Sequence, residues 1–179
     1  NNFKTVDDRR ISQLNFENVS INTDQIVSTG DEAEQLLKDA INYGTLCVSA
    51  EAVGSMESCY LKTVEYTKSR EQFGQPISNF QVLQHKMVDM FIETELCKSL
   101  LYKSMIDMHE SNESKYRSVS ALKSQVGISG KKVGEDAVQL HGGMGVSEEM
   151  SIGHYLKRFI SIDSQFGNSH FHLKKFNNS

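Results

Sequence analysis

Residues 69–77 carry the most distinctive chemistry of the sequence, Ser-Arg-Glu-Gln-Phe-Gly-Gln-Pro-Ile. Gly74 and Pro76 predict a tight turn between two long helical patterns. At such a turn the guanidinium of Arg70 can form a forked pair with a phosphate or a carboxylate, and the ring of Phe73 offers a flat apolar face. A structural role is equally compatible with these residue types, with Arg70 at a helix end and Phe73 filling the end of a bundle.

Residues 137–145, Ala-Val-Gln-Leu-His-Gly-Gly-Met-Gly, form the second informative stretch. Backbone N–H groups in a glycine-rich turn can approach an anion without obstruction. The amide of Gln139 can bind a phosphate, a sugar or a base. A glycine that ends a helix would give the same pattern. The spacing differs from a Walker loop, and no strand precedes the glycines as a dinucleotide fingerprint requires.

Composition narrows the class of protein. The chain has 179 residues, 38% hydrophobic and 23% charged, which is typical of a globular domain, and its formal net charge of −4 argues against nucleic acid as a partner. It shows neither a membrane-spanning apolar run nor a signal peptide, so we expect no membrane insertion and a cytoplasmic location. Because the chain begins at Asn1 in what looks like a strand, we expect a fragment of a longer protein.

Cysteines and histidines give no metal-binding pattern. Cys47, Cys59 and Cys97 are widely spaced, which predicts buried, reduced thiols. The six histidines have no ligand spacing, and His170 and His172 would point in opposite directions in an extended tail. We therefore expect no metal site.

The hydrophobic pattern predicts an all-α fold. Residues 1–29 alternate in part like short strands, as in the tail of a truncated β-domain. Helices are expected over about 31–68, 79–109, from the polar turn at 110–114 to 141, and over about 149–163, with Ser78 and Gln81 forming a capping box before the second. Short connections favour an up-and-down four-helix bundle over residues 30–179. Two apolar stripes predict a first helix buried on more than one side: Leu37, Ile41, Gly44 and Val48, and Leu36, Ala40, Cys47 and Gly54.

Together the two motifs resemble the signatures of the acyl-CoA dehydrogenase family. Residues 66–77, followed by Phe80 and Gln81, are similar to the first signature, and residues 137–145 are similar to the second. Their order and separation also match. The resemblance covers essentially the whole chain, with residues 1–29 similar to the last strands of the family's middle β-domain.

This resemblance implies an FAD enzyme that desaturates acyl-CoA thioesters. In the family a carboxylate removes the α-proton, the β-hydride goes to the flavin, and the electrons leave to an electron-transferring flavoprotein. It implies that Arg70, Gln72, Phe73 and Gln81 hold the FAD diphosphate and adenosine. It also implies that Gln139, Leu140, His141, Gly142 and Gly143 approach the FAD of a neighbouring same-family subunit in a homo- or heterotetramer.

The catalytic base departs from the family pattern. Where the family usually has Glu-Gly, this chain has Phe166-Gly167, and where some members place the Glu in the first bundle helix it has Gly44. Glu51, two turns further along, is a candidate only if the register shifts, so the base is left unassigned. The segment from Asn168 to His170 also differs from one that touches FAD in the family.

A Phe-Gly-Asn tail resembles the small subunits of heteromeric bacterial acyl-CoA dehydrogenases of the pimeloyl-CoA type. In such pairs one subunit can supply the base and the other mainly binding surface. Two alternatives remain: an active homomeric dehydrogenase with a displaced base, and a non-catalytic helical assembly module without FAD. The acyl-chain specificity is not determined by these residues.

Overall fold

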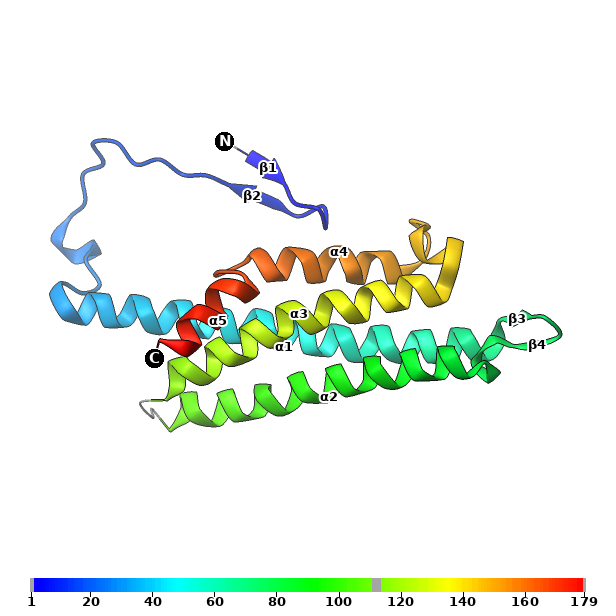
Figure 1. The fold of residues 1–179 in the computed structure, drawn as a ribbon. Helices are drawn as coiled ribbons and strands as arrows, with labels where there is room; N and C mark the ends of the chain where they lie inside the picture. The colour runs from blue at the N-terminus through cyan, green and yellow to red at the C-terminus, as the bar shows by residue number, and fades with distance from the viewer. Residues whose placement is uncertain (1, 111–113, 179) are drawn as a thin grey trace.

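The computed structural model describes residues 2–110 and 114–178, and Figure 1 shows a bundle of long antiparallel helices. In the described part the helices are α1 (Gly30–Ser69), α2 (Gln81–His109), α3 (Lys115–His141), α4 (Ser151–Ser164) and α5 (Ser169–Asn177). The chain runs up and down through α1 to α4, which confirms the all-α fold predicted from the sequence. Part of the predicted polar turn at 110–114 lies outside the described residues.

Short strands and 3₁₀ turns complete the fold. The strands β1 (Asn2–Lys4) and β2 (Arg10–Ser12) pair antiparallel, with Phe3 opposite Ile11. A small hairpin, β3 (Glu71–Gln72) and β4 (Gln75–Pro76), follows α1. The 3₁₀ turns are η1 (Thr23–Gln25), η2 (Ile77–Asn79) and η3 (Gly142–Val146).

Helix α3 forms the centre of the bundle because it packs against each of the other four helices. Its predicted inward stripe is buried: Val119, Leu122, Val126, Val133, Ala137 and Leu140. Met56, Met90 and Phe159 contribute to the same core from α1, α2 and α4. The 3.6-residue period therefore predicted the core face of α3 correctly.

The buried face of α1 differs from the predicted one. Leu36, Leu37 and Ile41 are exposed, whereas the inward face is rich in small polar residues such as Thr45 and Ser49. These hydroxyls can be buried because each donates to the carbonyl one turn earlier, Thr45 to Ile41 and Ser49 to Thr45, both at 2.7 Å. A search for apolar stripes misses a helix face built in this way.

Two further local predictions were wrong, for Ser78 and for Cys47, and the tail, whose structure the sequence left open, is helical. Helix α2 begins at Gln81 with Phe80 as its N-cap and no side-chain cap, so Ser78 lies in η2 rather than in a capping box. The tail holding His170 and His172 is helical, because the Asn168 side chain accepts from Phe171 N at 2.8 Å and caps α5. Cys47 is exposed, whereas Cys59 and Cys97 are buried as expected.

An ion-pair cluster ties the β1–β2 hairpin to the bundle. Arg158 on α4 is 8% exposed and donates to both carboxylate oxygens of Glu51 at 2.7 Å and to Asp7 at 2.8 Å. Burial raises the pKa of Asp7, but hydrogen bonds from Thr5, Arg158 and Ser161 outweigh it and lower that pKa to about 2. Arg158 therefore joins segments 151 residues apart in the chain.

Replacing Arg158 tests this cluster. Arg158→Ala should lower the free energy of unfolding by about 3 kcal/mol, because it leaves the carboxylate of Asp7, whose side chain is 6% exposed, with only the more distant Arg9 at 3.7 Å as a cation. Urea denaturation followed by circular dichroism measures the loss. The difference from the wild type should shrink as the pH falls from 3.8 towards about 2, because Asp7 then becomes protonated. Lys157→Ala, which breaks the exposed pair with Glu148, is the control and should cost less than about 1 kcal/mol. An equal loss in both variants would contradict this role of Arg158.

Candidate functional site

The first motif forms a hairpin at the end of α1. Arg70 is the C-cap of α1, and its N–H donates to Tyr66 O at 2.9 Å. Phe73 and Gly74 have positive φ angles of 54° and 80°, as the central residues of a type I′ turn require. The ring of Phe73 is 92% exposed and makes an edge contact with Phe80 at 6.0 Å. The hairpin thus leaves Arg70 exposed where α1 ends.

The second motif ends α3. Gly142 has φ +58°, and its N–H donates to Gln139 O, so the glycine stops the helix as the sequence predicted. The Cβ position of Gly143 faces open space, which leaves its backbone uncovered. By contrast, a Cβ at Gly145 would lie 2.6 Å from Val138 O, so η3 packs tightly on the helix it follows.

The two motifs meet in one hollow of about 430 Å³. Seven of the nine predicted cofactor residues line it: Arg70, Gln72, Gln139, Leu140, His141, Gly142 and Gly143. Phe73 and Gln81 are exposed and do not line it. Because α1 and α3 end at the same side of the bundle, two motifs about 70 residues apart share this site.

Tyr66 is a site residue that the sequence analysis missed. Its ring stacks on His141 with centroids 4.1 Å apart and an interplanar angle of 21°. Its hydroxyl donates to His141 O at 3.4 Å. Its place one helical turn before Arg70, on the same face of α1, was the available signal.

At the position where the resemblance to the family leads us to expect a catalytic base, this chain has the aromatic ring of Phe166. An added Cβ on Gly44 would lie 2.7 Å from Phe166 Cζ, so the tip of the Phe166 ring packs on α1 at Gly44. Phe166 and Gly44, the two positions where the resemblance leads us to expect a Glu, therefore adjoin each other, and neither residue has a carboxylate.

Hydrogen bonds from buried side chains hold the turn that carries Phe166. Lys123 is fully buried and donates to the carbonyl oxygens of Asp163 and Gly167, each at 2.9 Å, and burial lowers its pKa to about 8. His172 Nε2 lies 3.0 Å from Phe166 O. Phe166 and Gly167 have φ angles of 56° and 100°, a costly conformation for phenylalanine. These bonds hold the ring in a defined place.

Glu51 is unsuited to act as the base. Hydrogen bonds from Arg158 to both of its oxygens, with Arg9 nearby at 3.3 Å, hold the pKa of Glu51 below its ordinary value. A carboxylate that is stabilised in its charged form by a forked guanidinium is a weak proton acceptor. Its geometry indicates a structural ion pair.

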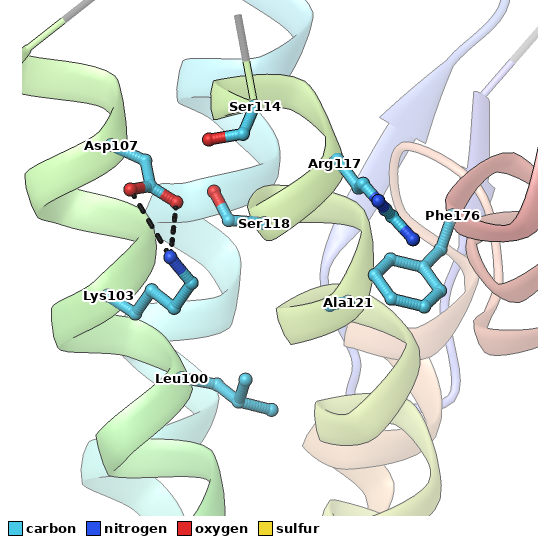
Figure 2. Close-up of a pocket in the computed structure, with 8 residues that line it drawn as sticks. All are labelled: Leu100, Lys103, Asp107, Ser114, Arg117, Ser118, Ala121 and Phe176. Atoms are coloured by element: carbon cyan, nitrogen blue, oxygen red, sulfur yellow. Dashed lines mark hydrogen bonds and ion pairs between the residues drawn. The ribbon is translucent and has the colours of Figure 1, made fainter. Parts of the chain in front are cut away.

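Among the hollows in the described part of the chain, two of those that lie away from the two motifs have buried or charged groups in their lining. One of about 470 Å³ is lined in part by Phe166, Asn42 and His172, and Asn42 Oδ1 and His172 Nδ1 are buried without a hydrogen-bond partner in the described structure. Another of about 350 Å³ lies among α2, α3 and α5, where Figure 2 shows Asp107 paired with Lys103 and Arg117 beside Phe176. Neither hollow is lined by a residue of the two motifs.

Within residues 2–110 and 114–178, no group of three or more His, Cys, Asp or Glu side chains is placed to hold a metal ion. None of the helices described here is both long enough and apolar enough to cross a membrane.

Replacing Gly44 measures the contact with Phe166. Gly54→Ala, on the same helix in open space, should stabilise the protein by about 1 kcal/mol through helix propensity. Gly44→Ala should lose that gain, because its methyl group meets the ring, and Phe166→Ala should restore it. A double-mutant cycle by urea denaturation should therefore give a coupling of about 1 kcal/mol. Equal effects of the two alanines in the wild type would contradict the contact.

Comparison with known proteins identifies the family of this chain. Residues 35–174 match the family described as Acyl-CoA dehydrogenase, C-terminal domain. The short-chain specific acyl-CoA dehydrogenase of Megasphaera elsdenii is 27% identical over 145 residues, which is 81% of this chain and 38% of that protein.

Solved structures agree on the fold. Butyryl-CoA dehydrogenase from Megasphaera elsdenii superposes with a TM-score of 0.85 at 24% identity, and the FAD complex of PigA with 0.85 at 23%. Each covers 91% of this chain, and the chain covers 42% of each. The chain thus spans less than half the length of these relatives, and by its matching residues it belongs to the acyl-CoA dehydrogenase family, to whose C-terminal domain it corresponds.

Proposed function

We propose that this chain is the FAD-binding and subunit-association part of an acyl-CoA dehydrogenase-type flavoprotein that takes part in α,β-desaturation of acyl-CoA thioesters. The observation that carries the proposal is the meeting of Arg70 with the Gly142–Gly143 turn in one hollow. The FAD in the PigA structure and the butyryl-CoA named for the other neighbour support the cofactor and the substrate class.

The residues of the hollow fit the diphosphate and the adenosine of FAD. Arg70 can donate two parallel hydrogen bonds to phosphate oxygens, and Gly143 lets a ligand approach the backbone. The side-chain amides of Gln72 and Gln139 can bind sugar or base. The volume of the hollow, about 430 Å³, lies within the range of ligand pockets. Phe73 and Gln81 would contact only a ligand that extends beyond the hollow. When bound, FAD would supply the acceptor for the β-hydride of the thioester.

The carboxylate that removes the α-proton is proposed to come from elsewhere. Phe166 occupies its usual position, Gly44 has no side chain, and Glu51 is committed to Arg158. A partner subunit of the same family supplies it in this proposal, as in heteromeric dehydrogenases of the pimeloyl-CoA type. The pairing of Glu51 disfavours the alternative of a homomeric enzyme that uses Glu51 as a displaced base. We further propose an electron-transferring flavoprotein as electron acceptor and a cytoplasmic location.

Arg70 provides the test of cofactor binding. In the full-length protein, Arg70→Ala should weaken FAD binding about ten- to a hundred-fold, because it removes a charge-assisted pair worth about 1.5–3 kcal/mol. Arg70→Lys should restore only part of the affinity, since an ammonium cannot fork. Equilibrium dialysis against FAD measures both variants. Arg117→Ala, which removes an arginine that stacks on Phe176 outside the hollow, should leave the affinity unchanged. Absence of FAD binding by the wild type would favour the non-catalytic assembly module.

The missing base makes a second prediction. We expect this chain alone to be inactive. The full-length subunit, loaded with FAD, should show almost no flavin bleaching with acyl-CoA, and a partner subunit that carries the Glu should restore it. Phe166→Glu should restore it weakly, since an error of about 1 Å in placement can cost a hundred-fold. Stopped-flow absorbance follows the bleaching. Rapid bleaching by the protein alone that is abolished by Glu51→Gln would instead identify Glu51 as the base.

Exposed apolar side chains on α1 and α2 support subunit association. Val88, Ile92 and Leu96 recur at four-residue spacing on α2 and are 53%, 48% and 51% exposed. Burying such a face favours association at about 25 cal/mol per Å² before association costs. Leu96→Glu should therefore increase the monomer fraction in sedimentation at micromolar concentration. Val27→Glu, at a 93% exposed loop position, is the matched control and should have no effect. A monomeric wild type would contradict the association.

A further inference from the structure

We propose that the hollow among α2, α3 and α5 binds a small carboxylate with an apolar body, and that Arg117 holds the carboxylate group. This hollow shares no lining residue with the hollow between the ends of α1 and α3. The inference therefore does not depend on FAD binding, and the two proposals can be tested separately.

Side chains from three helices shape the hollow. On α3 it is lined by the short side chains of Ser118 and Ala121. Figure 2 shows Leu100 of α2 on one side of them and Phe176 of α5 on the other. The volume of about 350 Å³ lies at the lower end of the range for small-molecule pockets. Facing apolar side chains and a volume of this size suit the apolar part of a small ligand.

An ion pair on α2 already satisfies two of the charged groups in the lining. The carboxylate of Asp107, whose side chain is 9% exposed, accepts from Lys103 Nζ at 3.1 and 3.4 Å. This hydrogen bond lowers the pKa of Asp107, so the carboxylate is charged at neutral pH. Lys103 and Asp107 therefore neutralise each other and add no net charge to the hollow.

Arg117 is the remaining cation of the lining. Its guanidinium carbon lies 4.6 Å from the centre of the Phe176 ring, and no carboxylate within residues 2–110 and 114–178 forms an ion pair with it. Stacking uses the face of a guanidinium, whereas its five N–H donors lie in the plane of the group. The edge of Arg117 can therefore form two parallel hydrogen bonds with a carboxylate while Phe176 covers its face.

The charge of the lining selects the class of ligand. Lys103 and Arg117 are positive and Asp107 is negative, which leaves a net charge of +1. A cation would be repelled by Arg117, and a neutral apolar molecule would cover Arg117 without pairing with it. An anion without an apolar body would make no use of Leu100 and Phe176. A carboxylate on an apolar body satisfies both the cation and the apolar walls.

Such a ligand would also connect α5 to the bundle. Phe176 lies in the last turn of α5 and Arg117 in the first turn of α3. A ligand that contacts both side chains binds only while α5 is packed on α3, so its binding stabilises the packed state by mass action. The stability of α5 is therefore a second readout of occupancy.

Protection of a thiol tests the site directly. Ala121 is partly exposed and lines the hollow, so the thiol introduced by Ala121→Cys in the full-length protein should react with iodoacetamide. Octanoate at ten times its dissociation constant should slow this reaction about ten-fold, because about a tenth of the sites stay open. Cys47 is exposed and does not line this hollow, so its rate should not change. Peptide mass spectrometry measures both rates, and slowing at both thiols or at neither would overturn the inference.

The charge of the ligand gives the comparison that assigns Arg117. In the Ala121→Cys protein, 1-octanol, which has the same apolar body without the charge, should protect the thiol with about ten-fold weaker affinity than octanoate. Acetate at the concentration used for octanoate should not protect it. Addition of Arg117→Gln should reduce the affinity for octanoate to that for 1-octanol. Equal affinities for octanoate and 1-octanol before that change would overturn the role of Arg117.

Hydrogen exchange on the unsubstituted full-length protein covers the case in which Ala121→Cys disturbs the packing. Octanoate should slow the exchange of the α5 amides, because binding raises the free energy of opening that helix, and it should leave the amides of the β1–β2 hairpin unchanged. Arg117→Gln should remove most of this slowing. Exchange in α5 that is the same with and without octanoate would overturn the inference.

Arg70 separates the two hollows. Arg70→Gln, which changes only the hollow between the ends of α1 and α3, should leave octanoate protection as it is. Loss of protection in that variant would place octanoate in the other hollow and overturn the inference. A protein that fails to bind FAD but shows this protection would overturn only the proposed function.

Discussion

The burial of α3 is the constraint on which the rest of the structure depends. Every other helix packs against it, and its inward face includes polar groups as well as apolar ones. The ammonium group of Lys123 is fully buried and must find acceptors in the core, because an unpaired buried charge is costly. It finds them in the carbonyl oxygens of Asp163 and Gly167, so the central helix determines the shape of the turn between α4 and α5.

That turn in turn decides what faces α1. With its backbone held by Lys123 and His172, the turn places the ring of Phe166 on Gly44. Gly44 has no side chain, and this absence makes room for the ring. The phenylalanine at position 166 and the glycine at position 44 are thus two parts of one packing arrangement. A carboxylate at either position would need different neighbours.

At the opposite end of the bundle, the C-terminal ends of α1 and α3 lie next to each other. Helix α1 stops at Arg70 and α3 stops at Gly142, and stacking of Tyr66 on His141 joins them. A cation, uncovered backbone and an imidazole are brought together beside the small β3–β4 hairpin, which contributes Gln72. The chemistry proposed for this hollow depends on this junction more than on any single residue.

The amino-acid sequence alone determined the order of the long helices, the inward stripe of α3 and the two motifs. These features follow from local period, turn chemistry and residue identity, which act over a few residues. Only the tertiary structure decided the buried face of α1, because Thr45 and Ser49 satisfy their hydroxyls within the helix and so pack like apolar residues. It alone also paired Glu51 with Arg158, Tyr66 with His141 and Phe166 with Gly44. Each of these contacts joins residues between 75 and 122 positions apart, and such a contact depends on how the helices pack rather than on the local pattern.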